Sequence, residues 1–173
     1  MRTRTQTREL LSTAIAVVAV VTSGCGVMNN LQAATVTNPM TPEQSKAQVV
    51  DAAHELVHAL GLHVVKAVFW HSSCNDDGDP PFRGRMMITY PPAASYEASE
   101  SEIASMVQRL QSVGWAGDSN FHSHGSVLKK NNVVATFYPG TADKNPGIDL
   151  LGECRDVTTT KQTRGSTQEV NLG

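Results

Sequence analysis

The hydrophobic residues that follow Thr41 recur every three or four positions and predict an amphipathic helix. Thr41 and Gln44 match a capping box, Pro42 suits the first helical position, and Gly61 is a typical terminator. The apolar stripe is formed by Val49, Val50, Ala53, Leu56, Val57 and Leu60. We therefore expect a helix from about Thr41 to Gly61 that packs one face on a core.

The pattern changes to β-branched and aromatic residues at 64–73 and again at 83–90, which predicts two strands. The sequence CNDDGDPP at 74–81 lies between them and is typical of a turn. A second helix is predicted over 100–113, because Ser99 and Glu102 match a capping box and apolar residues share one face. Gly114 is its expected terminator.

Three further strands are predicted over residues 120–129, 133–138 and 148–155, with Asn131 and Asn132 as the turn of a hairpin. The resulting order is αββ-αβββ. Strand–helix–strand units do not alternate regularly, which argues against a parallel doubly wound sheet. We expect the α+β class, with a mostly antiparallel sheet of about five strands and two helices on one face.

The N-terminus combines early arginines with an uncharged apolar run at 10–21, which is typical of a secretory signal. This run is too short to span a hydrocarbon core, which needs about 20 residues. Residues 21–25 (VTSGC) resemble a bacterial lipobox, although Thr22 departs from the usual Leu or Val. The resemblance implies cleavage after Gly24, with an S-diacylglycerol group and an N-acyl group on Cys25.

Four regions follow from these patterns. Residues 1–24 are a lipoprotein signal peptide, 25–40 a lipidated cysteine and flexible tether, 41–156 an α+β domain, and 157–173 a polar C-terminal tail. An ordinary signal peptide with an incidental Cys25 is the alternative for the first boundary.

The chain has three cysteines, an odd number for an exported protein. If Cys25 carries lipid, Cys74 and Cys154 remain, and we expect them to form a disulfide in an oxidising compartment. The alternative is two free thiols that serve redox or metal chemistry.

Residues 41–156 resemble the mycobacterial LppA-like lipoproteins. The matching segments are 41–45 (TPEQS), 73–75 (SCN), 78–81 (GDPP), 114–115 (GW), 128–129 (LK) and 151–155 (LGECR). The resemblance implies a small envelope lipoprotein. It supports the lipid anchor and the paired cysteines, and it supplies no catalytic residues.

The sequence HELVH at 54–58 is an intact H-E-x-x-H motif on the first predicted helix. His54 and His58 share a helix face and could bind Zn²⁺, with Glu55 as a base on bound water. The extension to His63 is similar to the metzincin proteases, but His63 comes one residue early.

Several observations argue against a protease. The helical wheel places His54 and His58 beside Asp51 and away from the apolar stripe, so we expect them to face water. Only a tether and part of this helix precede the motif, which leaves no place for a substrate-holding strand. We therefore expect a solvated helix face, with adventitious metal binding and a zinc hydrolase as alternatives.

Weaker patterns have ordinary structural interpretations. His122 and His124 share a strand face, and the acidic cluster Asp76, Asp77 and Asp79 does not fit a twelve-residue calcium loop. Phe69, Trp70, Trp115 and Tyr138 could line an apolar pocket between sheet and helices, although core packing is the default. Lys129 and Lys130 are expected in a solvated turn.

The net charge excludes one class of partner. The full chain carries 14 basic and 16 acidic residues, a net charge of −2. Removal of Arg2, Arg4, Arg8 and Glu9 with the signal lowers this to −4, so a nucleic-acid partner is not expected. We predict a non-enzymatic lipoprotein without a cofactor, anchored to the extracytoplasmic face of the cell membrane, with a binding or scaffolding domain. The alternatives are the zinc hydrolase and a carrier of a small apolar ligand or lipid.

Overall fold

The computed structural model describes residues 36–121, 123, 125–140 and 144–173. The predicted signal peptide, Cys25, His122 and His124 lie outside the described residues. Within them the elements are α2 (Pro42–Leu60), β1 (Lys66–Ser73), β2 (Phe82–Thr89), α3 (Tyr96–Ser112), β3 (Ala116–Gly117), β4 (Ser126–Lys130), β5 (Val133–Tyr138), β6 (Gly147–Leu151) and β7 (Gln168–Glu169).

The strands form one sheet in the order β3-β4-β5-β6-β2-β1-β7, and all of its pairings are antiparallel. This confirms the α+β class. The expected count of about five strands is low, because the described sheet has seven. The two additional strands, β3 and β7, have two residues each and are too short to show an alternating pattern.

α2 agrees closely with its prediction. Thr41 adopts an extended conformation, and its hydroxyl accepts a hydrogen bond from the Gln44 backbone N–H. The Thr41 backbone N–H donates to the Gln44 side-chain oxygen, which completes the capping box. Gly61 ends the helix in the left-handed region, with φ of 61°. These signals act within one turn of the chain, which explains why the sequence alone locates both ends.

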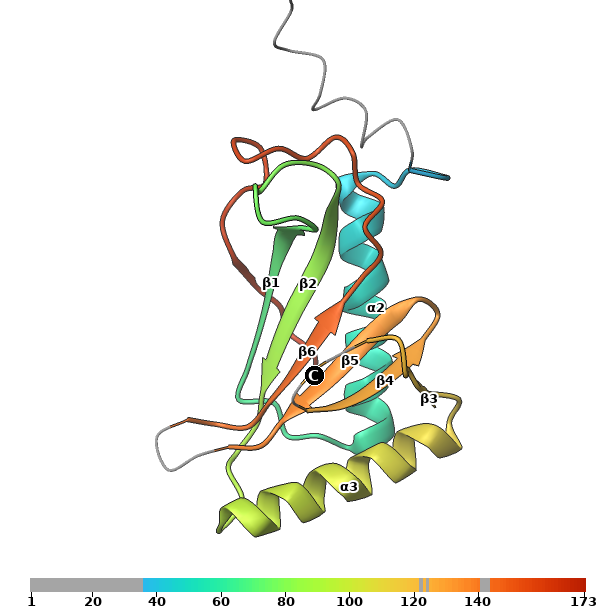
Figure 1. Ribbon diagram of the computed structural model, residues 1–173. Coiled ribbons are helices and arrows are strands. Elements are labelled where there is room, and N and C mark those ends of the chain that lie inside the picture. The colour runs from blue at the N-terminus through green and yellow to red at the C-terminus, as the bar shows by residue number, and fades with distance from the viewer. Residues whose placement is uncertain (1–35, 122, 124, 141–143) are drawn as a thin grey trace, which may run out of the picture.

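One hydrophobic core lies between the sheet and the helices. α2 runs along the back of the sheet, and α3 lies across the end of the sheet opposite the start of α2 (Figure 1). Apolar residues of both helices and of β1, β2, β4, β5 and β6 meet there. The fully buried members include Val49, Ala53, Leu56, Phe69, Met86, Ile88, Leu110, Phe137, Ile148 and Leu150.

α2 approaches the sheet closely at Gly84 of β2. The Gly84 backbone N–H donates a hydrogen bond of 2.6 Å to the Ser45 hydroxyl, and Ser45 is fully buried. The neighbouring strand continues into Gly152, whose backbone N–H bonds to the Gly84 carbonyl oxygen at 3.0 Å. The absence of a side chain at Gly84 therefore allows helix and sheet backbones to meet.

α3 begins earlier than predicted. Ser95, and not Ser99, is the N-cap, and its hydroxyl accepts from the Ala98 backbone N–H at 3.1 Å. Ser99 lies inside the helix, is 2% exposed, and accepts a hydrogen bond from the Gly140 backbone N–H. Serine is a favourable cap at either position, and in the structure Ser99 contacts a distant loop while Ser95 caps the helix.

The segment expected to be a polar tail packs on the domain. Gln168 and Glu169 pair with Phe69 and Val68 of β1, and Leu172 is only 6% exposed within the core. The described domain therefore extends beyond residue 156. The sequence TTTKQTRGSTQ has no apolar period, so the pattern of residues could not predict this packing.

Asp156 anchors the start of this segment. Its carboxylate is fully buried and accepts hydrogen bonds from the backbone N–H and hydroxyl groups of Thr158 and Thr159. Burial alone would raise the pKa of Asp156, but these hydrogen bonds outweigh it and hold the pKa below its ordinary value of 3.8. The charged form is therefore favoured in the folded state.

This arrangement predicts a pH-dependent loss of stability. Because folding lowers the pKa of Asp156, its contribution is present above the ordinary value and disappears as pH falls through the lowered one. At pH 7, Asp156→Asn should reduce the free energy of unfolding by about 2 kcal/mol. Urea unfolding between pH 7 and pH 3 should show this difference shrinking below about pH 4. The exposed Asp77→Asn is the control, and an equal loss for both variants would contradict the prediction.

Candidate functional site

The H-E-x-x-H motif lies on the side of α2 that faces away from the core. His54 and His58 are exposed, whereas Leu56 and Val57 between them are buried. The side chain of Glu55 is 41% exposed. His63 lies three residues beyond the end of α2 and is exposed as well. In the described part of the chain, no group of three His, Cys, Asp or Glu residues is arranged to hold a metal ion.

Glu55 has a partner that the sequence did not indicate. Lys130, at the end of β4, donates a hydrogen bond from its Nζ to the Glu55 carboxylate and a second one, of 2.7 Å, to the Val113 carbonyl oxygen. Lys130 is therefore not the solvated turn residue that was expected. It joins α2, the end of α3 and the β4–β5 hairpin at one point.

A polar cavity of about 240 Å³ adjoins this ion pair. Asp51 and Glu55 of α2 line one side, and Trp115, Lys130 and Asn131 line the other. Trp115 is 2% exposed, and its indole Nε1 has no hydrogen-bond partner among the described residues. The carboxylate of Glu55 and the ammonium group of Lys130 are already paired, which leaves Asp51 as the charged residue of the lining without an ion pair among the described residues.

The acidic turn between β1 and β2 is held by its own hydrogen bonds. The Asn75 side chain accepts from the Asp79 backbone N–H at 3.1 Å and donates to the Asp79 carbonyl oxygen at 3.2 Å. The Asp79 carboxylate lies 3.5 Å from the Lys161 ammonium group. Asp76 and Asp77 are exposed. These contacts account for the acidic residues as parts of a turn.

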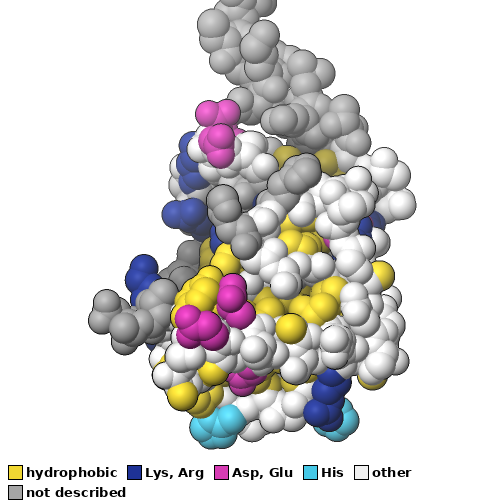
Figure 2. All heavy atoms as spheres, turned by 60° about the horizontal axis from the view of Figure 1, so that its bottom comes forward, with side chains coloured by type: hydrophobic (Ala, Val, Ile, Leu, Met, Phe, Trp, Pro, Cys, Tyr) yellow, Lys and Arg dark blue, Asp and Glu magenta, His cyan; other side chains and the backbone are white. Residues whose placement is uncertain are grey.

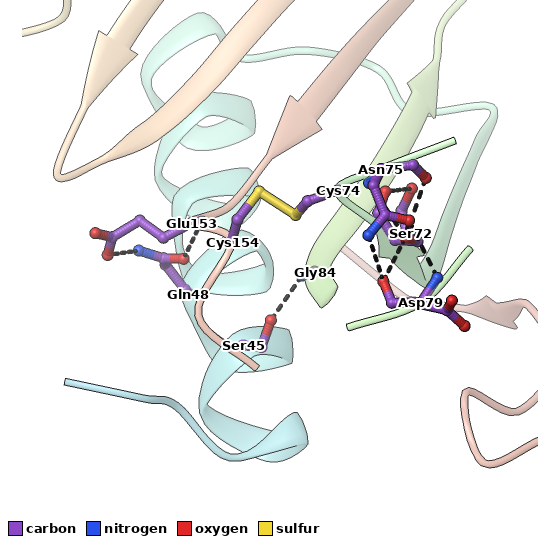
Figure 3. The surroundings of a disulfide bond; sticks show 10 residues. Ser45, Gln48, Ser72, Cys74, Asn75, Asp79, Gly84, Glu153 and Cys154 are labelled. Carbon is purple, nitrogen blue, oxygen red and sulfur yellow. Dashed lines mark hydrogen bonds between the residues drawn. A yellow bond between two sulfur atoms is a disulfide. The ribbon is translucent and has the colours of Figure 1, made fainter. Parts of the chain in front are cut away.

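A disulfide joins Cys74, at the end of β1, to Cys154, which follows β6 (Figure 3). The two Cα atoms are 6.0 Å apart and 80 residues separate them in sequence. Beside this bond, the Gln48 side chain of α2 bonds to the backbone N–H and the carboxylate of Glu153, as Figure 3 shows. The disulfide thus lies where two strand ends and α2 come together.

The aromatic residues that could have lined an apolar pocket are divided between two faces of the sheet. Phe69 and Trp115 are buried in the core. Trp70 lies on the opposite face, under the Arg85 guanidinium group at 5.2 Å, and Arg85 forms a two-point hydrogen bond with the buried Asp149. The carrier alternative expected these residues to line a cavity between the helices and the sheet, but Phe69 and Trp115 belong to the packed core and Trp70 lies on the other face.

The sequence was compared with the models of known protein families. The model of the family described as "Putative lipoprotein LppJ" matches residues 41–172. The chain belongs to the LppJ lipoprotein family. The match confirms the expected resemblance to the mycobacterial LppA-like lipoproteins, and the matching member is LppJ. The LppJ match also includes the segment after residue 156, in agreement with the packed C-terminal part of the fold.

Similar lipoproteins occur in mycobacteria. The chain is 32% identical over 123 residues to the lipoproteins LppJ of Mycobacterium tuberculosis, strain H37Rv, and Mycobacterium bovis. The match covers 70% of this chain and 64% of each relative. The chain therefore spans slightly less than two thirds of the length of these relatives. No solved structure matches the fold closely enough to be counted as similar.

Membership of the LppJ family implies association with the cell envelope. None of the described helices is both long enough and apolar enough to cross a membrane.

Proposed function

We propose that this chain is exported, carries lipid on Cys25, and presents a non-catalytic binding or scaffolding domain on the extracytoplasmic face of the cell membrane. The observation that carries the proposal is the disulfide between Cys74 and Cys154, because such bonds persist in oxidising compartments. It accounts for two of the three cysteines and leaves Cys25, at the end of an apolar run, for lipid.

The beginning of the domain supports attachment through the N-terminus. The Arg155 guanidinium group donates to the Asn38 carbonyl oxygen, and the Met40 backbone N–H bonds to the Arg155 carbonyl oxygen at 2.8 Å. The last residues of the expected tether are therefore fastened to the domain. They lie at the end of the domain opposite α3 (Figure 1), so the expected tether joins the domain at that end.

The anchor is tested by substitution. Cys25→Ala should abolish incorporation of labelled palmitate and release the protein from the membrane fraction, because two or more acyl chains are needed for stable anchoring. The measurement is gel fluorography of the immunoprecipitated chain after growth with the label. Cys74→Ala is the matched control and should retain the label. Label incorporation that persists in Cys25→Ala would refute the lipid site.

The non-catalytic role rests on the surroundings of the H-E-x-x-H motif. Glu55, which a hydrolase would use as its base, is engaged by Lys130 in an ion pair that links α2 to β4. Metal analysis of the purified chain provides the test, with His54→Ala/His58→Ala as the comparison. One zinc ion per chain that is lost in this double variant would replace the proposal with a zinc-dependent hydrolase.

A further inference from the structure

A second cavity, of about 400 Å³, lies where α2, α3 and the segment after β2 converge. Its apolar wall includes Leu60, Leu62 and Met106, and its polar groups come from His63, Tyr90 and Glu102. Figure 2 turns this end of the molecule toward the reader and shows hydrophobic side chains close to acidic and histidine side chains. The volume falls within the range of small-molecule pockets, which combine an apolar lining with a few polar groups.

Tyr90 contributes a buried hydroxyl to this cavity. The residue is only 1% exposed, and its Oη has no hydrogen-bond partner among the described residues. Burial, together with the negative charge of Glu102, raises the pKa of Tyr90 to about 12, so the group stays a neutral phenol. A buried hydroxyl without a partner is costly, and a ligand or a water molecule that bonds to it removes that cost.

Glu102 of α3 also lines the cavity, and one of its carboxylate oxygens, Oε2, is buried without a hydrogen-bond partner within the described residues. None of the ion pairs found in this part of the chain involves Glu102. A partly buried carboxylate is complementary to a cation that can donate hydrogen bonds.

We propose that this cavity binds a small organic ammonium ion. Its nitrogen donates hydrogen bonds to the Glu102 carboxylate and the Tyr90 hydroxyl, and its hydrocarbon part contacts Leu60, Leu62 and Met106. An anion is disfavoured, because the cavity has a carboxylate and no lysine or arginine in its lining. A metal ion is disfavoured as well, because the lining offers too few ligating groups in a suitable arrangement.

This inference rests on the proposed binding role and names the class of ligand. The cavity lies at the α3 end of the domain, opposite the end that the expected tether joins. Anchoring and ligand binding are measured separately. A chain that takes up palmitate but no amine would refute only the inference, and a chain that binds amine without palmitate would refute only the anchor.

The test is a titration of the full chain, carrying methyl-labelled methionine, in phosphatidylcholine nanodiscs. The probe is hexylammonium chloride, and hexanol is the neutral control of the same chain length. The methyl resonance of Met106 should shift and reach saturation with hexylammonium, whereas hexanol should cause no saturable shift. Met86, which is fully buried and outside the cavity lining, should stay unshifted and reports on the integrity of the core.

Three variants locate the binding groups. Glu102→Gln should weaken hexylammonium binding by at least about tenfold, because it removes a charged hydrogen-bond acceptor. Tyr90→Phe should weaken it several-fold. Glu100→Gln, an exposed position on the same helix, is the matched control and should leave binding unchanged. Absence of a saturable Met106 shift, equal binding of hexanol, or unchanged binding by Glu102→Gln would each overturn the proposal.

Discussion

Removal of the disulfide is expected to reduce the free energy of unfolding by about 4 kcal/mol. Cys74 and Cys154 close a loop across 80 residues, and the bond restricts the unfolded chain over that length. The chain-entropy relation gives a large effect because the loop is long. The bond also ties the end of β1 to the segment after β6, which are separated in the sheet by β2.

The measurement compares urea unfolding of the wild type with that of Cys74→Ala/Cys154→Ala. Dithiothreitol should shift the wild-type midpoint toward that of the double variant and should leave the double variant unchanged. Cys25→Ala retains the disulfide and serves as a matched control for the loss of a cysteine. If the double variant is as stable as the wild type under non-reducing conditions, the stabilising role of the bond is refuted.

Gly84→Ala should reduce stability by about 3 kcal/mol and lower the melting temperature by about 10 °C. A Cβ atom at Gly84 would lie 2.2 Å from the Ser45 carbonyl oxygen and 3.0 Å from a methyl carbon of Val49. The first of these atoms belongs to the backbone of α2, so the helix would have to move away from the sheet. This movement would also strain the bond between the Gly84 N–H and the Ser45 hydroxyl.

Gly117→Ala is the matched control, because a Cβ atom there has no neighbour within 4 Å. Its effect on stability should stay within about 0.5 kcal/mol. Thermal unfolding followed by circular dichroism compares the two variants. Equal melting temperatures would show that the close approach of α2 to β2 does not limit the side chain at position 84.

Much of the fold could be predicted from local patterns. The capping box at Thr41, the stripe from Val49 to Leu60 and the terminator Gly61 define α2, because each signal acts within one or two turns. The hairpin between β4 and β5 is equally local. Asn131 and Asn132 both have positive φ, which asparagine tolerates better than most residues.

Other parts of the fold depend on long-range contacts. The expected cap, Ser99, lies inside α3 and accepts a hydrogen bond from the distant Gly140 backbone N–H, while Ser95 caps the helix. β7 is recognised only through its pairing with β1 across about 100 residues, because its own two residues are polar. A strand that contributes mainly backbone hydrogen bonds leaves no pattern of side chains by which it could be predicted.

The candidate sites show the same division. The H-E-x-x-H motif and its position on an outward helix face follow from the period of α2. The engagement of Glu55 by Lys130 joins residues 75 positions apart, and no local pattern indicates it. Tyr90 had no distinguishing motif, and Glu102 was expected only as the partner of Ser99 in a capping box, which the cap at Ser95 replaces. Burial without hydrogen-bond partners distinguishes them, and burial is a property of the tertiary structure.

The sequence by itself determined the α+β class, the position of α2, the cysteine count that favours one disulfide, and the export pattern behind the predicted anchor at Cys25. These features depend on residue type and short spacing along the chain. Only the tertiary structure decided the extra edge strands, the partner of Glu55 and the two cavities lined by Trp115 and by Tyr90. Those features depend on which distant segments share a surface, and packing of the whole core sets that.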